Sequence, residues 1–183
     1  MKKILLLLLV AMSVCLGGFA QKGMQAVGVD VIPACYPNSE RQLSIGVGMK
    51  YQYNLTDYIR LAPSAKYVFP HDADKWDEYE SLQLGMDMNF YLTPLSRVRS
   101  YFIAGIYYNH VIDYDKSYDD KYYANIVTTN FGIGLDYRLS YNITLQAEIM
   151  YGFPILLKDR DIMLNDKETH QSLSLGIGVA YNF

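Results

Sequence analysis

The feature that most constrains the fold of this chain is an alternation of apolar with small or polar residues, clearest in QSLSLGIGVAYNF at residues 171–183. Successive side chains of a β-strand point to opposite faces of the sheet. One face of this segment would therefore be wholly apolar, with Leu173, Leu175, Ile177, Val179, Tyr181 and Phe183. The other face would carry Ser, Gly, Ala and Asn, so the two faces are expected to meet different surroundings.

The same period recurs along the chain and predicts eight strands. Clear segments lie at residues 43–53, 59–69, 82–92, 127–137, 143–151 and 171–183, and weaker ones at 23–32 and 99–111. Segments of about ten alternating residues separated by turns are the signature of an outer-membrane barrel. The expected fold class is all-β, an eight-stranded antiparallel up-and-down transmembrane β-barrel. Pro63 removes one ladder hydrogen bond, which predicts a bulge there.

The connections between these segments alternate in length. The short ones are residues 54–57, 93–96 and 139–142, and the long ones are residues 33–40, 70–78, 112–123 and 154–170. Outer-membrane barrels have short periplasmic turns and longer extracellular loops. An even number of strands then places both termini at the periplasmic end.

The apolar faces are predicted to point outward into lipid, because the interior of an eight-stranded barrel has room only for side chains. A secreted lipocalin-like barrel with the apolar face inward is the alternative, and it would crowd large apolar side chains into one cavity. If the apolar faces contact lipid, four basic and four acidic groups lie inside the barrel: Asp30, Lys50, Arg60, Lys66, Asp87, Asp136, Arg138 and Glu148. Buried charges need partners, so these residues are predicted to form a lumenal ion-pair network.

The chain contains 18 Tyr, an excess that the barrel would explain. Tyr and Trp prefer membrane interfaces, where an apolar ring and a polar tip are both accommodated. Rings near the short-turn ends of the strands are Tyr51, Tyr53, Phe90, Tyr137, Tyr181 and Phe183; rings near the loop ends are Tyr67, Phe69, Tyr108 and Tyr151. These residues predict two outward-facing girdles, with the large side chains outside the barrel and the small ones inside.

The first 20 residues, MKKILLLLLVAMSVCLGGFA, are typical of a cleaved secretory signal peptide, which leaves residues 21–183 as the barrel domain. Cleavage would remove Cys15 and leave Cys35 as a single thiol, predicted to lie in a loop and unable to form an internal disulfide. The remaining chain would have 14 basic and 19 acidic residues, a net charge of −5. No basic patch suggests a nucleic-acid partner.

The strand number, the alternating loop lengths, the ending Tyr181-Asn182-Phe183 and the segment DYRLSYNITLQAEIMYGF together resemble the OmpX and OmpA-barrel family of small outer-membrane proteins. The resemblance implies a Gram-negative outer-membrane location and contact with outer-membrane lipid and lipopolysaccharide. It also implies that the barrel-assembly machinery recognises Tyr181 and Phe183. No enzyme activity, cofactor or metal is expected, and no peptidoglycan-binding domain follows the barrel. The task is expected to be structural, or a surface interaction with an extracellular ligand through the loops.

Two other functions stay open at this point. His170 and Ser172 match the H-x-S pattern of the lipid A deacylase PagL, in which histidine activates a serine nucleophile. A small porin is the other alternative. The acidic segment 113–119 superficially resembles a calcium loop but lacks the glycine and glutamate at the required positions, which favours a solvated loop.

Overall fold

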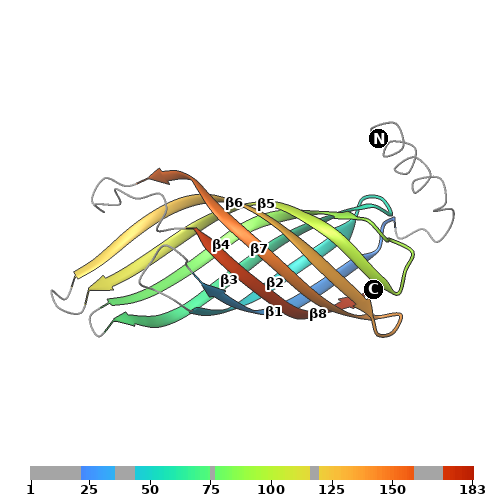
Figure 1. Ribbon diagram of the computed structural model, residues 1–183, viewed down its shortest axis with the longest axis horizontal. Coiled ribbons are helices and arrows are strands. Elements are labelled where there is room, and N and C mark those ends of the chain that lie inside the picture. The colour runs from blue at the N-terminus through green and yellow to red at the C-terminus, as the bar shows by residue number, and fades with distance from the viewer. Residues whose placement is uncertain (1–21, 36–43, 75–76, 116–119, 159–170) are drawn as a thin grey trace, which may run out of the picture.

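The computed structural model describes residues 22–35, 44–74, 77–115, 120–158 and 171–183. Eight antiparallel strands follow chain order around a closed barrel, and the last strand pairs with the first (Figure 1). The strands are β1 (Gln25–Cys35), β2 (Ser44–Asn54), β3 (Ile59–Asp74), β4 (Asp77–Tyr91), β5 (Val98–Asp115), β6 (Asp120–Arg138), β7 (Ile143–Lys158) and β8 (Ser172–Asn182). The predicted fold class is confirmed. Within these ranges no helix is both long and apolar enough to cross a membrane.

Short connections join β2 to β3, β4 to β5 and β6 to β7 at one end of the barrel, here called the short-turn end. The sequence sets the first of these turns, because the Thr56 hydroxyl oxygen accepts hydrogen bonds from the backbone N–H groups of Tyr58 and Ile59 at 3.1 and 3.0 Å. Such hydroxyl-to-backbone bonds replace ladder bonds where a strand ends. Strand β1 begins and β8 ends at this same end, since Ala26 pairs with Asn182.

The strands extend further toward the opposite end, the loop end, than the alternation predicted. Most of the predicted loops 70–78 and 112–123 is strand, because β3 runs to Asp74 and β5 to Asp115. Strand β1 likewise continues to Cys35, which ends a strand and does not lie in a loop. In the added part of β3, the segment PHDAD at residues 70–74 carries no alternation of large apolar residues to detect.

The prediction of a bulge at Pro63 is wrong. Pro63 pairs with Met86 in a register that runs unshifted from the Ile59 pair to the Val68 pair between β3 and β4. The neighbouring pairs hold the register although the proline donates no hydrogen bond. Register shifts occur instead further along the same β3–β4 pair, between Val68 and His71 and between Asp72 and Asp74. Another lies between Val127 and Thr128, where β6 pairs with β7.

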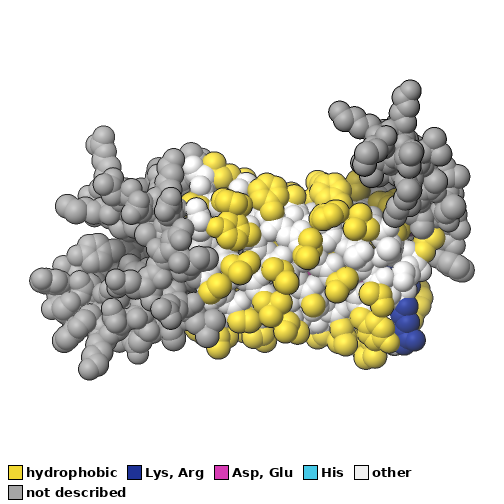
Figure 2. Space-filling view, in the orientation of Figure 1, with side chains coloured by type: hydrophobic (Ala, Val, Ile, Leu, Met, Phe, Trp, Pro, Cys, Tyr) yellow, Lys and Arg dark blue, Asp and Glu magenta, His cyan; other side chains and the backbone are white. Residues whose placement is uncertain are grey.

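The outer surface of the wall is apolar and the inner surface is not. Val29, Ile133 and Ile177, near the middle of their strands, are 53%, 55% and 57% exposed. The alternate residues of the same strands are mostly buried in the barrel interior. Figure 2 shows the hydrophobic side chains spread over the visible wall between the two ends. The predicted outward orientation of the apolar faces is confirmed.

Several large rings, however, lie inside the barrel, contrary to the prediction that large side chains point outward. Tyr91, Tyr101 and Tyr107 are buried at 5%, 1% and 1% exposure. Tyr101 and Tyr107 fit because glycines on adjacent strands leave room for them. A Cβ at Gly134, which pairs with Tyr101, would overlap the Tyr101 ring, and a Cβ at Gly85 would overlap the Tyr107 ring.

Two glycines of β8 give a matched test of this packing. A Cβ at Gly178 would overlap the backbone oxygen of Val29, whereas a Cβ at Gly176 would meet its nearest atom, the Glu148 Cβ, at 3.7 Å, an ordinary contact. Gly178→Ala is therefore expected to lower the free energy of unfolding by about 1–3 kcal/mol. Gly176→Ala should change it by less than about 1 kcal/mol. Urea unfolding in lipid vesicles measures both, and equal effects would contradict this account.

A charge on the outer wall tests its orientation. Ile177→Arg would place a guanidinium on the outer face at the middle of β8, and an arginine at the bilayer midplane costs about 2–4 kcal/mol. The same change at Tyr141, 80% exposed in the β6–β7 turn, should cost about 0–1 kcal/mol. Unfolding free energies in vesicles compare the two variants. A tolerated Ile177→Arg would indicate that this face meets water.

Candidate functional site

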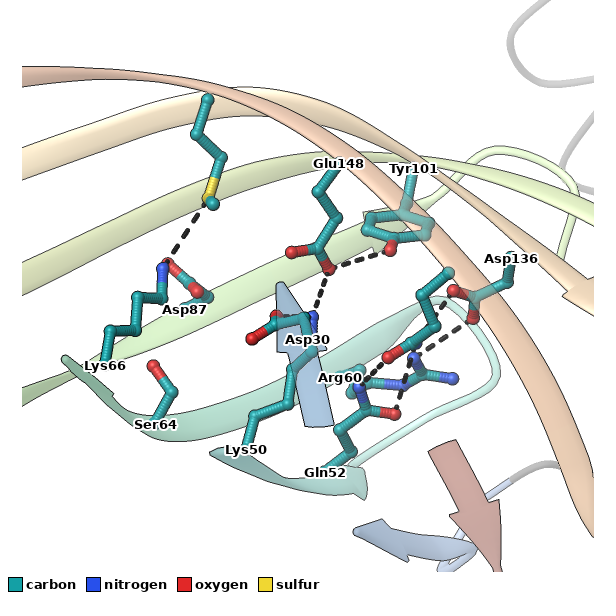
Figure 3. A network of polar contacts seen from close by, with 12 residues as sticks. Asp30, Lys50, Gln52, Arg60, Ser64, Lys66, Asp87, Tyr101, Asp136 and Glu148 are labelled. Carbon is teal, nitrogen blue, oxygen red and sulfur yellow. Dashed lines mark hydrogen bonds and ion pairs between the residues drawn. The ribbon is translucent and has the colours of Figure 1, made fainter. Parts of the chain in front are cut away.

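The predicted charged residues converge on the barrel interior, the lumen. All of them except Arg138 are buried there, on strands that lie far apart in sequence: Asp30 (β1), Lys50 (β2), Arg60 and Lys66 (β3), Asp87 (β4), Asp136 (β6) and Glu148 (β7). Figure 3 shows these side chains pointing inward from their strands. Three layers of contacts can be distinguished between the short-turn end and the loop end.

The Asp136 hub is the layer nearest the short-turn end. Its carboxylate is fully buried, and its Oδ2 lies 3.1 Å from Arg60 Nη1 and 2.7 Å from Arg99 Nη2. The Tyr91 hydroxyl donates to the same oxygen at 2.8 Å, and Gln146 Nε2 donates to Oδ1 at 2.9 Å. Side chains from four other strands thus contact the Asp136 carboxylate of β6, which satisfies the requirement that a buried charge be both paired and hydrogen-bonded.

Neighbouring groups extend the hub across the barrel. Gln52 Nε2 on β2 donates to Gln146 Oε1 at 2.8 Å, and Arg60 Nε donates to Asn54 Oδ1 at 2.9 Å. The guanidinium carbons of Arg60 and Arg99 lie 4.8 and 5.2 Å from the centre of the Tyr91 ring, within cation–π range. The lumen is therefore filled by side chains at this level.

The Lys50 triad, consisting of Lys50, Asp30 and Glu148, forms the middle layer. The ammonium of Lys50 lies 3.1 Å from Asp30 Oδ2 and 2.9 Å from Glu148 Oε1 (Figure 3). Tyr101 donates its hydroxyl proton to Glu148 Oε1 at 2.9 Å. Asp30 pairs with glycines on both neighbouring strands, Gly48 and Gly178. These glycines leave room for a carboxylate that a larger residue would displace.

The Lys66 layer, consisting of Lys66, Asp87 and Tyr107, lies nearer the loop end. Tyr107 donates its hydroxyl proton to Asp87 Oδ2 and is 2.8 Å from the Ser64 hydroxyl. The Lys66 ammonium lies 4.2 Å from the centre of the Tyr107 ring and 3.9 Å from Met150 Sδ. Within the described lumen, Lys66 makes no ion pair, in contrast to Lys50.

Arg99, which the sequence analysis did not name, occupies the place in the network that was predicted for Arg138. Arg138 ends β6 at the short-turn end, is only half-buried, and makes no ion pair among the described residues. Arg99 is 1% exposed and lies opposite Asp136 in the β5–β6 ladder, which brings the two side chains together. The sequence reading missed Arg99, although its position three residues before the outward-facing Phe102 assigns it to the inner face.

The loop-end half of the lumen contains a small cavity of about 40 Å³, and its described lining is neutral except for Lys66. Ser172 and Ser174 of β8 line it together with Thr128 and Asn130 of β6. Ser172, the proposed nucleophile, thus faces the lumen, while His170 lies outside the described residues. Across the described ranges, no group of His, Cys, Asp and Glu residues could hold a metal ion.

The predicted assembly residues lie at the end of β8. Tyr181 and Phe183 are 56% and 62% exposed on the outer face, and the Phe183 N–H donates to the Gln25 carbonyl at 3.0 Å. The predicted signal peptide, residues 1–20, lies outside the described residues.

Comparison with known proteins identifies the architecture. No protein-family model and no curated protein sequence matches the chain. Solved structures do: Neisserial surface protein A superposes with a TM-score of 0.65 at 14% identity, over 91% of this chain and 100% of that one. The N-terminal barrel domain of Pseudomonas aeruginosa OprF gives 0.62 at 20% identity, over 88% and 100%. Ail of Yersinia pestis gives 0.61 at 12% identity, over 89% and 100%. The chain therefore has the fold of the small eight-stranded outer-membrane barrels, as the resemblance predicted.

Removal of the central carboxylate tests the network. Asp136→Asn would leave the buried Arg60 and Arg99 without a counter-charge, and breaking a buried pair costs about 3–5 kcal/mol. The expected result is a loss of that size in the free energy of unfolding, measured by urea titration in vesicles. Asp57→Asn in the β2–β3 turn is the matched control; its carboxylate accepts a solvent-exposed hydrogen bond from the Lys22 N–H at 3.3 Å, so the change should cost no more than about 1 kcal/mol. Equal effects of the two variants would contradict the role given to Asp136.

Proposed function

We propose that the protein is an integral outer-membrane protein of a Gram-negative envelope, without enzyme activity, that contributes to envelope structure or to surface interactions. Residues 1–20 would be removed as a signal peptide, and residues 21–183 would form the barrel with both termini in the periplasm. The observation that carries this proposal is the sidedness of the wall. An apolar outer surface around a closed ladder is stable in hydrocarbon, because each described strand pairs its backbone polar groups with a neighbour on both sides.

The lumen supports a structural role over a porin. In the Asp136 hub, side chains from β3, β4, β5, β6 and β7 meet within hydrogen-bonding distance and fill the cross-section. In the next layer toward the loop end, the Lys50 ammonium contacts carboxylates of both β1 and β7. Conduction would require these buried charges to separate, and removing one partner from a buried pair costs about 3–5 kcal/mol. The contacts of the Asp136 hub and the Lys50 triad thus link strands to one another across the lumen.

A surface interaction would use the loop end. Four connections meet there, and binding residues are often carried on loops held by a rigid scaffold. One structure of Ail, at 11% identity to this chain, contains the heparin analogue sucrose octasulfate. A sulfated sugar is thus one ligand class for a barrel of this fold. We infer that lipopolysaccharide or an extracellular ligand is the partner of this end.

The deacylase alternative has less support. Ser172 pairs with Gly152 and lines the lumenal cavity, whereas attack on a membrane lipid requires a nucleophile on the outer face. The outward-facing neighbour on β8, Leu173, carries no reactive group.

The assembly role of Tyr181 and Phe183 belongs to the same proposal. Both rings are exposed at the end of β8, where an assembly factor could reach them before β8 joins β1.

Expression of the full chain in a Gram-negative host tests the location. The expected result is recovery in the outer-membrane fraction and extraction only by detergent, with a gel mobility that changes on boiling because the folded barrel migrates differently from its denatured chain. Recovery of a folded monomer in buffer without detergent would overturn the proposal.

The same strain and the purified protein distinguish the proposed function from the deacylase and porin alternatives. Lipid A mass spectra should match those of the parent strain, and loss of an acyl chain would favour the deacylase. Planar-bilayer recordings of the purified barrel should show no sustained large conductance. Sustained conductance would establish a pore and refute the closed lumen.

A further inference from the structure

The cavity at the loop end of the lumen is lined, among the described residues, by one cationic side chain and otherwise by neutral residues. It has a volume of about 40 Å³, and its described lining includes neutral donors and acceptors from Gln83, Thr128, Asn130, Ser172 and Ser174. The one ionised side chain among the described lining residues is Lys66. The cavity therefore places a cation beside several hydroxyl and amide groups, with no carboxylate in its described wall.

Lys66 is incompletely compensated in comparison with the other buried cations. Lys50 has two carboxylates within 3.1 Å, and Arg60 and Arg99 share Asp136. Lys66 is 6% exposed, and an ammonium has three N–H donors. Its direct contacts are a thioether sulfur and an aromatic face, and both are weak partners for an ammonium. The carboxylate of Asp87 also attracts it electrostatically, without forming an ion pair.

Among the inner carboxylates, Asp87 lies nearest to Lys66 in the β3–β4 ladder. It lies on the side of Lys66 that faces away from the cavity. It pairs with Ala62, whereas Lys66 pairs with Gln83, so Asp87 lies toward the short-turn end and away from the cavity. Its Oδ2 accepts the Tyr107 hydroxyl proton, and Asp87 makes no ion pair in the described lumen. Lys50 and Glu148 face this region as well but belong to the Lys50 triad. The charge of Lys66 is therefore available to an ion on its loop-end side.

We propose that this cavity is a binding site for a small monovalent anion of halide size. Lys66 supplies the charge, and hydroxyl groups supply hydrogen bonds. Thr128 Oγ1 accepts from Asn109 Nδ2 at 2.9 Å, which leaves the hydroxyl hydrogen of Thr128 to donate. One water needs about 10–15 Å³. The cavity therefore accommodates a halide and excludes an organic anion such as gluconate.

Bromide is the probe for the test, used on the full barrel folded in detergent. Crystals grown in sodium bromide should show an anomalous peak in the cavity, within hydrogen-bonding reach of Lys66 Nζ. Unfolding in bromide is then compared with unfolding in gluconate at equal ionic strength. At ten times its dissociation constant, bromide should raise the folded-to-unfolded ratio about elevenfold.

The variants are Lys66→Met and, as matched control, Lys22→Met, since Lys22 is exposed before β1. The bromide effect should disappear in Lys66→Met and persist in Lys22→Met. A bromide effect retained by Lys66→Met would overturn the proposal, as would equal stability of the wild type in the two salts. If Lys66→Met fails to fold, the wild-type crystals decide, because a cavity without a bromide peak refutes the site.

Discussion

The structure depends on the requirement that every backbone N–H and C=O within a hydrocarbon layer has a hydrogen-bond partner. A flat sheet leaves two edges unpaired, and only closure removes them. Here the pairing of β8 with β1 closes the ladder, from Ala26 opposite Asn182 to Cys35 opposite Leu173. The alternation of side chains follows from this closure, since each strand must present one face to the lipid and one to the lumen.

Closure with eight strands leaves a narrow interior, and the composition of the inner face follows from that width. Some large inner side chains fit only because a glycine lies opposite them on an adjacent strand, as Gly134 does for Tyr101 and Gly48 for Asp30. Charges within this space must be matched, and the Asp136 hub and the Lys50 triad achieve this with short contacts. The same inner residues thus provide both the packing and the ion pairs. A shift of one strand against its neighbour would disrupt both, so the register of each strand depends on the strands beside it.

The strand number, the sidedness and most of the inner charges could be predicted because each depends on a period of two within one strand. Lys50 and Asp136, for example, lie on inner faces defined entirely by their own strands. The partner of Asp136 could not be predicted in this way. Arg99 and Arg138 both lie near it, and the choice depends on the β5–β6 register, which pairs Arg99 with Asp136. The extension of β3 to Asp74 was also missed, because PHDAD at residues 70–74 shows no alternation of large apolar residues.

The closing contact joins residues near the two extremes of the described chain, which has a consequence for biogenesis. Sequence separations of this size make a fold slow to form, because the loop-closure entropy must be overcome before the contact contributes stability. Until β8 is available, β1 and β7 each have an unpaired edge that a bilayer cannot accommodate. A nascent chain that stops before residue 172 would therefore have no stable membrane-embedded intermediate. Such a chain would remain an unfolded polypeptide open to proteolysis.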